Sequence, residues 1–272
     1  MIVNLINEFL SKEGQTLDDA LLQDVGKLAQ NAFRRQFGVR EVRSTLGLSS
    51  IGQCLRKQAY KALGYAENGK ELDSRAKIVF FMGDLTEMAV LQLARAAGVA
   101  ITDYGENQAS VEIDGIVGHP DALGTIAGTK YLIEVKSMSS YGFKEFEKGQ
   151  LDEAYRYQCN AYMKATGMEQ CVIIALNKDA GVLGEMVIER DPLIITDIEQ
   201  RIRLLKNATQ ENLPDRAYKP DEKGWLPWNC LYCGHHGTCW PKAQKILVSN
   251  RYKLAIQPEK EATELTTTPK EK

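Results

Sequence analysis

The sequence lacks several features that would assign a class of protein directly. It contains no apolar run approaching the 18 residues that a membrane-spanning helix requires. Its start is apolar but interrupted by Asn4, Asn7 and Glu8, and it lacks the basic residues and cleavage site of a signal peptide. No G-x-x-x-x-G-K-[ST] string is present, so we expect no ATP-driven unwinding of DNA. These absences favour a cytoplasmic protein without a membrane segment.

Neither sign of charge dominates the chain. The 34 basic and 36 acidic residues give a net charge of −2, which is no overall sign of a nucleic-acid partner. The local distribution differs, because residues 34–61 hold seven basic residues and one acid, Glu41. Such a segment is either a solvated basic face or a face that contacts phosphates. The seven basic residues are Arg34, Arg35, Arg40, Arg43, Arg56, Lys57 and Lys61.

Hydrophobic periodicity divides the 272 residues into a helical first part, a mixed middle and an irregular end. Helices are predicted over 16–37, 51–63, 74–97, 152–166 and 193–210. Strands are predicted over 109–113, 116–123, 131–136, 171–177 and 183–189. This order indicates a mixed α/β fold with a helical N-terminal part. The predicted regions are 1–49 (helical), 50–213 (α/β core), 214–248 (cysteine-rich appendix) and 256–272 (disordered tail).

Two carboxylates and a lysine stand at hairpin distance in the predicted strands. Asp121 lies in the string GHPDAL, and Glu134-Val135-Lys136 follows 13 residues later. Alternation places Glu134 and Lys136 on one face of their strand, and a hairpin lets Asp121 reach that face. Paired carboxylates repel unless a cation compensates, and Mg²⁺ or Mn²⁺ prefers such oxygen ligands. A Glu–Lys pair on the solvent face of a strand is the plain alternative.

These residues resemble the bipartite signature of the PD-(D/E)XK nucleases. On the following predicted helix, Gln158 and Tyr162 form Q-x-x-x-Y on one face, which is typical of the RecB-like branch of that family. Upstream, Gly83 and Glu87 match the G-x-x-x-E form of another element of the branch. The resemblance implies a RecB-like nuclease core, with a central mixed sheet flanked by helices.

The resemblance also implies roles for individual residues. Glu87, Asp121, Glu134 and the Val135 carbonyl would hold Mg²⁺ or Mn²⁺, and Asp84 is the alternative to Glu87. Lys136 would be the catalytic lysine, and Gln158 and Tyr162 would position it or the substrate. We expect His119, close to Asp121, to be structural rather than a ligand.

The six cysteines fall into two groups. Cys230 and Cys233 form C-x-x-C, and Cys239 follows, so three thiols crowd a short irregular segment. A local fourth ligand, His235 or His236, would complete a zinc site, whereas Cys54 would complete a four-cysteine site across the chain. Cys159 and Cys171 are expected to be core residues.

One cysteine ahead of the nuclease motifs and three behind them resembles the iron–sulfur RecB-like nucleases. These include the AddB nuclease domain and exonucleases of phages and of CRISPR adaptation. The resemblance favours a 4Fe–4S cluster, held by Cys54, Cys230, Cys233 and Cys239, over Zn²⁺. The aromatic residues near these cysteines are expected to shield the cluster or to stack on single-stranded bases. They are Trp225, Trp228, Tyr232 and Trp240.

We therefore expect a metal-dependent DNA exonuclease that prefers single-stranded DNA or DNA ends and acts in recombination, repair or CRISPR adaptation. A phage is one candidate source of such an enzyme. It would need a ready-made end or a recombination or helicase partner. Two alternatives stay open. One is a DNA-binding module with a vestigial nuclease site. The other is a zinc-binding interaction protein in which the IEVK string is a coincidence.

Overall fold

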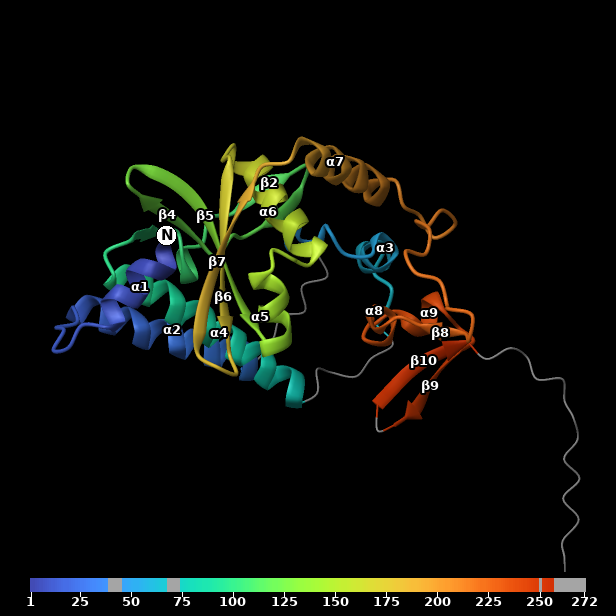
Figure 1. Ribbon diagram of the computed structural model, residues 1–272. Helices are drawn as coiled ribbons and strands as arrows, with labels where there is room; N and C mark the ends of the chain where they lie inside the picture. The colour runs from blue at the N-terminus through green and yellow to red at the C-terminus, as the bar shows by residue number, and fades with distance from the viewer. Residues whose placement is uncertain (39–45, 68–73, 250, 257–272) are drawn as a thin grey trace, which may run out of the picture.

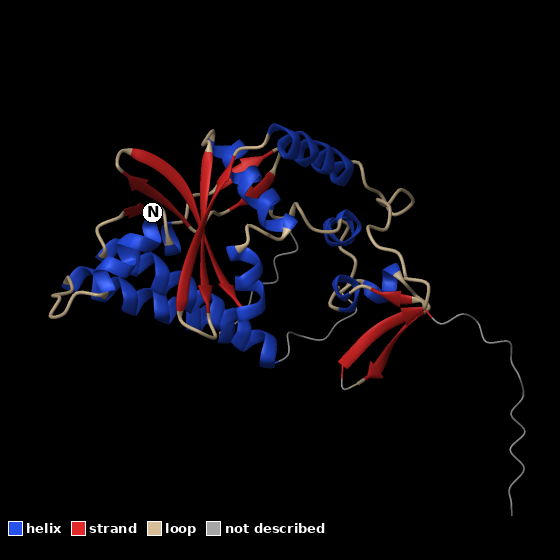
Figure 2. Cartoon of the chain, in the orientation of Figure 1, coloured by secondary structure: helices blue, strands red, loops and turns tan. Residues whose placement is uncertain are grey.

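The computed structural model describes residues 1–38, 46–67, 74–249 and 251–256. Its main part is a five-stranded sheet in the order β1-β4-β5-β6-β7, with helices on both faces (Figure 1, Figure 2). β5 and β6 are parallel, and the other neighbouring pairs are antiparallel. The expected mixed α/β fold is confirmed. The strands are β1 (Ala100–Thr102), β4 (Ala122–Ile126), β5 (Thr129–Met138), β6 (Gln170–Asn177) and β7 (Val182–Glu189).

One face of this sheet is covered by three helices from the first hundred residues. They are α1 (Ile2–Leu10), α2 (Asp19–Phe37) and α4 (Ser74–Ala96). α4 packs on β5, while α2 packs on α4 and α1 contacts both α4 and β7. Ile133 and Val135 of β5 are buried on this face, as alternation predicts, so Glu134, which lies between them in the sequence, points to the other face.

The second face carries the helices that follow in the sequence. They are α5 (Ser140–Glu147), α6 (Glu153–Thr166) and α7 (Pro192–Lys206). Tyr162 and Met163 of α6 pack with Leu132 of β5 and Ile173 of β6 in one buried cluster. α6 begins at the N-cap Asp152, whose carboxylate accepts a hydrogen bond from Ala154 N, and it ends at Gly167 with φ 72°. These ends fix which residues of α6 face the sheet.

The predicted strand over 116–123 is wrong. The chain instead forms β3 (Ile116–Gly118), which pairs with β2 (Val111–Ile113) in a separate hairpin, and then enters β4 at Ala122. Pro120 lies in the break and has no N–H for a ladder, which explains why one alternating string supplies two sheets. Helix α5, which the sequence analysis did not predict, begins at the N-cap Ser139.

The connection between α2 and α4 contains η1 (Leu48–Ser50) and α3 (Leu55–Ala62). The helix predicted over 51–63 is therefore present but begins four residues later, directly after Cys54. η1 packs against α6, and α3 packs against α7. Cys54 thus stands at the N-terminal end of a helix anchored on the second face.

The C-terminal part contains more regular structure than the sequence analysis predicted. A three-stranded sheet of order β8-β10-β9 packs against a short helix and encloses Leu226, Cys230 and Leu254. Its elements are β8 (Trp225–Leu226), α8 (Trp228–Leu231), α9 (His236–Cys239), β9 (Ala243–Val248) and β10 (Arg251–Ile256). β10 extends past the predicted end of the appendix at 248, and the rest of the predicted tail, 257–272, lies outside the described residues.

Within the described ranges, no helix is long and apolar enough to cross a membrane.

Candidate active site

The two carboxylates of the signature lie where β4 begins beside β5. The register that pairs Ala122 with Ile133 continues to place Asp121 next to Glu134. The Oδ2 atom of Asp121 accepts a 2.8 Å hydrogen bond from the backbone N–H of Val135. Glu134 is fully buried, on the face of the sheet that α6 covers. The expected hairpin is present, and it brings both carboxylates to one place.

Lys136 lies two residues along β5 on the same face. Its Nζ donates a 2.7 Å hydrogen bond to Oε2 of Glu134 and stands 5.0 Å from the centre of the Tyr155 ring. Both contacts favour the charged ammonium, since one partner is an anion and the other is an aromatic face. The lysine is thereby held in a fixed position beside the carboxylate.

Gln158 of α6 connects these groups. Its Nε2 donates a 2.9 Å hydrogen bond to Glu134 Oε2, and its Oε1 accepts a 3.3 Å hydrogen bond from Lys136 Nζ. Tyr162, one turn further along, donates from its hydroxyl to the backbone oxygen of His119 at 3.2 Å. The Q-x-x-x-Y face therefore contacts both halves of the signature: Gln158 contacts Glu134 and Lys136 of β5, and Tyr162 contacts the backbone of His119, two residues before Asp121.

Glu87 reaches the same region from α4. Its Oε1 accepts a 3.3 Å hydrogen bond from Gln108 Nε2. Burial, together with the Asp121 carboxylate, raises the pKa of Glu87 to about 8. Asp84, one turn earlier, is already engaged, because its Oδ2 accepts hydrogen bonds from Arg35 Nε at 3.0 Å and from Gln36 Nε2 at 2.7 Å. Of the two candidates, Glu87 has the freer carboxylate.

The electrostatics of the site show an excess of buried negative charge. Burial, and to a smaller extent repulsion from the Asp121 carboxylate, raises the pKa of Glu134 to about 8. Burial also raises the pKa of Asp121. Burial alone would lower the pKa of Lys136, but the Glu134 and Asp121 carboxylates raise it above its ordinary value. Lys136 and Arg35 thus face four carboxylates, those of Asp84, Glu87, Asp121 and Glu134, and a further cation would relieve their repulsion.

One oxygen of the site lacks a partner among the described residues. Oε1 of Glu134 is buried there without a hydrogen bond, while Oε2 contacts both Lys136 and Gln158. An unsatisfied buried carboxylate oxygen is costly, and such an atom calls for a missing partner. Across the described ranges, however, no three His, Cys, Asp or Glu side chains stand in an arrangement ready to hold a metal ion. The oxygen donors suit Mg²⁺ or Mn²⁺ chemically, but they have to move closer together to share an ion.

Sequence reasoning missed two contributors to this site. Tyr155 lies three residues before Gln158 on the same helical face, and that spacing could have identified it. Arg35 lies on α2, far away in sequence, and no local signal links it to Asp84. The side chain of His119 is exposed, and its backbone oxygen contacts the site through the hydrogen bond from Tyr162.

The four cysteines of the proposed cluster line a single cavity of about 380 Å³ between α3, the start of α6 and the short helices α8 and α9. Cys54 comes from one end of the fold, and Cys230, Cys233 and Cys239 come from the other. Burial, and to a smaller extent repulsion from the neighbouring cysteine thiolates, raises the pKa of Cys230 to about 11. Cys159 and Cys171 lie instead in the core between α6 and the sheet, as expected.

The two histidines near the cysteines differ in position. His235 is buried, lies 5.4 Å between ring centroids from Tyr60, and is not part of the cavity lining. His236 lines the cavity, with its Nδ1 2.8 Å from the Cys233 carbonyl oxygen. Of the local alternatives for a fourth ligand, only His236 shares the cavity with the cysteines.

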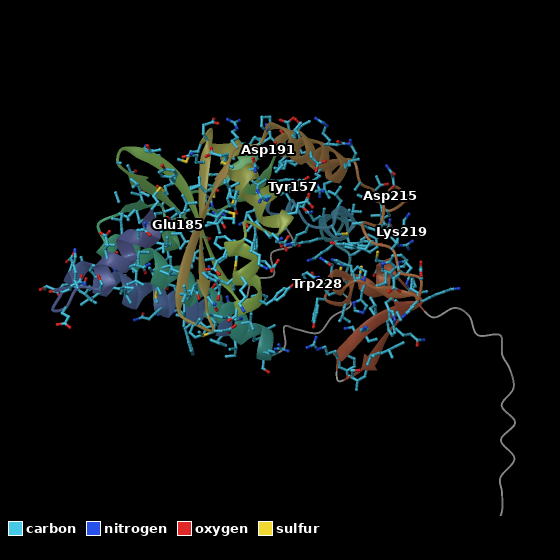
Figure 3. The ribbon with its side chains drawn as sticks, in the orientation of Figure 1. Tyr157, Glu185, Asp191, Asp215, Lys219 and Trp228 are labelled. Atoms are coloured by element: carbon cyan, nitrogen blue, oxygen red, sulfur yellow. The ribbon has the colours of Figure 1, made fainter. Side chains whose placement is uncertain are left out.

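Three of the four aromatic residues near the cysteines, Trp228, Tyr232 and Trp240, line the cavity. Trp228 is 66% exposed and Tyr232 is 79% exposed. Figure 3 shows Trp228 in the region between the α/β core and the C-terminal sheet. Trp240 packs under Arg216, whose guanidinium lies 4.3 Å from the ring centre. Trp225 lies under Lys253 at 5.2 Å.

The basic segment divides into tethered and available residues. Arg56 donates from Nη1 to the Pro214 carbonyl oxygen at 2.8 Å and from Nε to the Tyr60 hydroxyl at 3.0 Å, so it joins α3 to the C-terminal part. Lys57 makes an exposed 3.1 Å contact with Gln53. Arg40 and Arg43 lie outside the described residues.

No protein-family model matches the chain, and no curated protein matches it. Several solved structures show partial similarity. A protein described as SSO0001 has 16% identity and a TM-score of 0.49, over 82% of this chain and 98% of that chain. The alkaline exonuclease LHK-Exo from Laribacter hongkongensis has 17% identity and a TM-score of 0.45, over 65% and 90%. A phage-related exonuclease from Haemophilus somnus 129PT has 14% identity and a TM-score of 0.35, over 73% and 89%. At these levels the similarities assign neither a family nor an activity to this chain.

Proposed function

We propose that this protein is a divalent-metal-dependent nuclease that hydrolyses phosphodiester bonds of DNA. The observation that carries the proposal is the unpartnered Oε1 of Glu134, buried between Asp121 and a fixed lysine. A purely structural Glu–Lys pair would satisfy both oxygens or would lie on the surface. A carboxylate kept half-satisfied in the interior instead supports binding of a cation.

The ligands proposed for Mg²⁺ or Mn²⁺ are Glu87, Asp121, Glu134 and the Val135 carbonyl. The excess negative charge among the three carboxylates supports this set, and so does the weak hydrogen bonding of Glu87 compared with Asp84. When bound, such an ion would supply Lewis-acid stabilisation of the phosphate and a more acidic water.

The protein's own residues would hold the reacting groups in place. Lys136 keeps its proton, because Glu134 and Asp121 raise its pKa, and so it offers a permanent positive charge to an anionic phosphate. Gln158 restrains Lys136 and Glu134 relative to each other. The Tyr155 ring also contacts the lysine, and this contact reduces the conformational freedom that Lys136 would lose on binding substrate.

The test is cleavage of end-labelled single- and double-stranded DNA with Mg²⁺, Mn²⁺ or EDTA. Lys136→Ala should lose cleavage, because it removes the positive charge that would stabilise the transition state. Lys130→Ala is the matched control, since Lys130 is an exposed lysine on the same strand. Wild-type cleavage by Lys136→Ala, or cleavage that EDTA leaves unchanged, would contradict the proposal.

We also propose that the cysteine cavity holds a 4Fe–4S cluster on Cys54, Cys230, Cys233 and Cys239. The support is that four thiols from distant parts of the sequence line one cavity, as thiolate-bound clusters require. The cluster would tie the start of α3 to the segment that holds α8 and α9. A zinc site is the competing proposal, and the position of His236 makes it the histidine to test.

The motif order supports a finer version of the proposal: a preference for single strands or ends, in recombination, repair or CRISPR adaptation, with a phage as one source. With no ATP-binding motif, such an enzyme would act on an existing end or with a helicase.

A further inference from the structure

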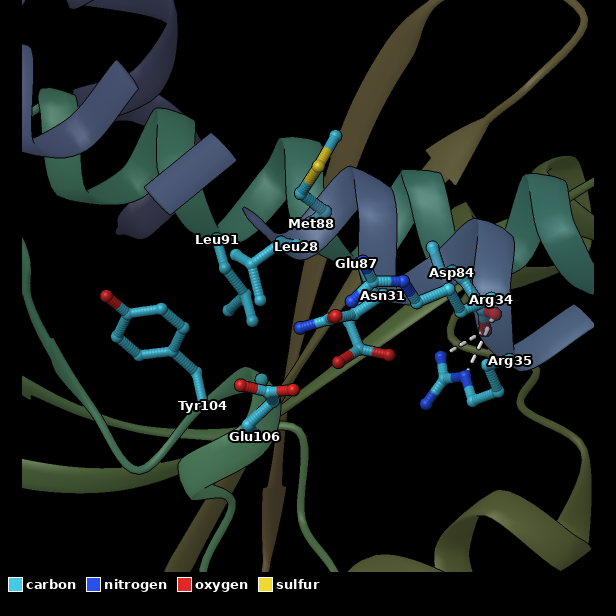
Figure 4. Close-up of a pocket in the computed structure, with 12 residues that line it drawn as sticks. Leu28, Asn31, Arg34, Arg35, Asp84, Glu87, Met88, Leu91, Tyr104 and Glu106 are labelled. Atoms are coloured by element: carbon cyan, nitrogen blue, oxygen red, sulfur yellow. Dashed lines mark hydrogen bonds and ion pairs between the residues drawn. The ribbon is translucent and has the colours of Figure 1, made fainter. Parts of the chain in front are cut away.

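Arginine side chains pair with aspartates at two places beside the helices of the candidate active site. Arg35 of α2 pairs with Asp84 of α4, as the close-up in Figure 4 shows. Arg201 of α7 donates a 2.6 Å hydrogen bond from Nε to Oδ2 of Asp197, one turn earlier on the same helix. Such an i,i+4 pair on a half-buried helix surface adds little to stability by itself. The remaining contacts of Arg201 set it apart.

The guanidinium of Arg201 binds the backbone of residues 51–54, which we call the Cys54 segment. Its Nη1 donates to the carbonyl oxygens of Ile51 at 3.4 Å and Gln53 at 3.2 Å. A planar guanidinium can reach these carbonyls and Asp197 at once, because its donors point in several fixed directions, whereas a lysine ammonium is a single point charge. Arg201 therefore fixes the backbone from which Cys54 faces the cysteine cavity.

Tyr157, which Figure 3 labels, brings α6 into the same network. Its hydroxyl donates a 2.7 Å hydrogen bond to Oδ2 of Asp197, and the guanidinium carbon of Arg201 lies 4.7 Å from the centre of its ring. A guanidinium over an aromatic face is attracted to the ring, and more strongly when the pair is partly withdrawn from water. The Cys54 segment, α6 and α7 thus meet at one guanidinium.

A glycine lets the Cys54 segment approach α6 closely. A Cβ atom on Gly52 would lie 2.6 Å from Cβ of Tyr157 and 2.9 Å from Cα of Ala154, so a larger residue would displace the helix or the segment. Because the two elements are packed without a gap at this point, a shift of the segment has to move the first turn of α6 with it. The clamp by Arg201 and the close packing at Gly52 act on the same turn.

Another face of this helical turn contacts the lysine of the candidate active site. The face that includes Tyr157 packs against the Cys54 segment. Tyr155 and Gln158, which lie three residues apart and so share a face, both contact Lys136. Tyr155 also lines the cysteine cavity. One turn of one helix therefore separates the cysteine cavity from the carboxylate site.

We infer that Arg201 is a positioning residue for both sites. It holds the Cys54 segment against the first turn of α6. Through that turn it keeps Tyr155 and Gln158 against Lys136. The effect on cleavage rests on the proposed function, and the inference goes beyond that function by linking the cysteine cavity to the carboxylate site. Because Arg201 is not part of the cavity lining, it acts through the residues that it holds.

The test labels two side chains of the full chain in one experiment. Arg201→Ala should raise the rate of alkylation of Cys54 by iodoacetamide and the rate of acetylation of Lys136 by acetic anhydride. Each rate should rise about fivefold, the factor expected for the loss of one hydrogen bond of ordinary strength. Mass spectrometry reads both rates residue by residue, in the protein as purified and after metal removal with a chelator.

The controls separate a local effect from general loosening of the fold. Arg190→Ala is the matched variant, because Arg190 also pairs with a carboxylate, that of the exposed Glu169 at 2.9 Å. It should change neither rate. Within Arg201→Ala itself, Lys130 on the surface and Cys171 in the core should react at their wild-type rates.

Cleavage of single-stranded DNA gives a second measurement. Arg201→Ala should lower kcat about 10- to 100-fold, the cost of a small displacement of the reacting groups, and should leave KM within about twofold. Tyr157→Phe keeps the ring and removes only the hydrogen bond to Asp197, so it should change both labelling rates and kcat in the same directions by less. Thermal melting checks the fold, and Tyr157→Phe decides if Arg201→Ala proves unstable.

The outcomes separate this inference from the proposed function. Unchanged labelling of Cys54 and Lys136, or a rise at only one of them, would overturn the shared role of Arg201. A rise in KM with unchanged kcat would overturn it too, because Arg201 would then contact DNA. If Glu134→Ala still cleaves, the nuclease proposal fails, whereas the two labelling rates still decide the role of Arg201.

Discussion

The Q-x-x-x-Y face gives the sharpest prediction, at Gln158. Gln158→Ala removes a 2.9 Å hydrogen bond to Glu134 and a 3.3 Å hydrogen bond from Lys136. A hydrogen bond to a charged group contributes about 1.5–3 kcal/mol. If only the shorter bond acts in the transition state, and a factor of ten corresponds to about 1.4 kcal/mol, turnover should fall about 10- to 150-fold. Lys136 and Glu134 keep their own contact, so the fold should persist.

The assay is single-turnover cleavage of end-labelled single-stranded DNA across a Mg²⁺ titration, with thermal melting in parallel. Gln170→Ala is the matched control, because Gln170 also donates to a glutamate, Glu189, at 2.7 Å but on the surface. It should cleave at the wild-type rate. A Gln158→Ala rate within twofold of wild type, alongside an inactive Glu134→Ala, would show that the bridge across the site does not contribute to catalysis.

Three further predictions test the other parts of the structure. Glu87→Gln should stabilise the metal-free protein by about 1–3 kcal/mol at pH 9 while abolishing cleavage, because a buried charge is removed. Glu87 has a higher pKa in the folded protein, about 8, than its unfolded value of 4.5, so its contribution to stability is present below pH 4.5 and is lost as pH rises through about 8. The two proteins should therefore unfold alike in denaturant at pH 4.5. Equal stability at pH 9 would contradict this reasoning. Protein purified without oxygen should be brown, and Cys54→Ala should bleach it whereas Cys159→Ala should not; zinc without iron in metal analysis would overturn the cluster. Arg56→Ala should lower the free energy of unfolding by about 1–3 kcal/mol, since it leaves the part-buried Pro214 carbonyl unpaired. Lys57→Ala should leave stability unchanged and reduce the salt dependence of DNA binding. The reverse pattern would show that Arg56 contacts DNA and that Lys57 is the tether.

The sequence predicted the elements that depend on local signals. α6 follows from helical spacing ended by Gly167, and the inward direction of Ile133 and Val135 follows from alternation in β5. Because these two elements carry Glu134, Lys136 and Gln158, the arrangement of the central residues could be anticipated. Their mutual distances could not, since the parallel pairing of β5 with β6 sets how α6 lies over the sheet.

Other features depend on contacts between distant residues and were not predictable. The break at Pro120 leaves the alternation of the string unchanged, so the string reads as one strand although it belongs to two sheets. The role of Arg56 as a tether depends on Pro214, which follows 158 residues later. The C-terminal sheet was missed because β9 and β10 gain their apolar cover from α8, from Leu226 of β8 and from Tyr218 and Trp240, which no local pattern in the two strands indicates.

The cavity lined by Cys54 and the three C-terminal cysteines has a consequence for the order of synthesis. Cys54 leaves the ribosome long before Cys230, so the α/β core can fold while this cavity has only one of its four thiols. The cavity becomes complete only after Cys239 has emerged. If the cavity holds the proposed cluster, iron delivery is a late step in maturation, and a chain truncated before α8 could carry an intact carboxylate site without ever acquiring that cluster.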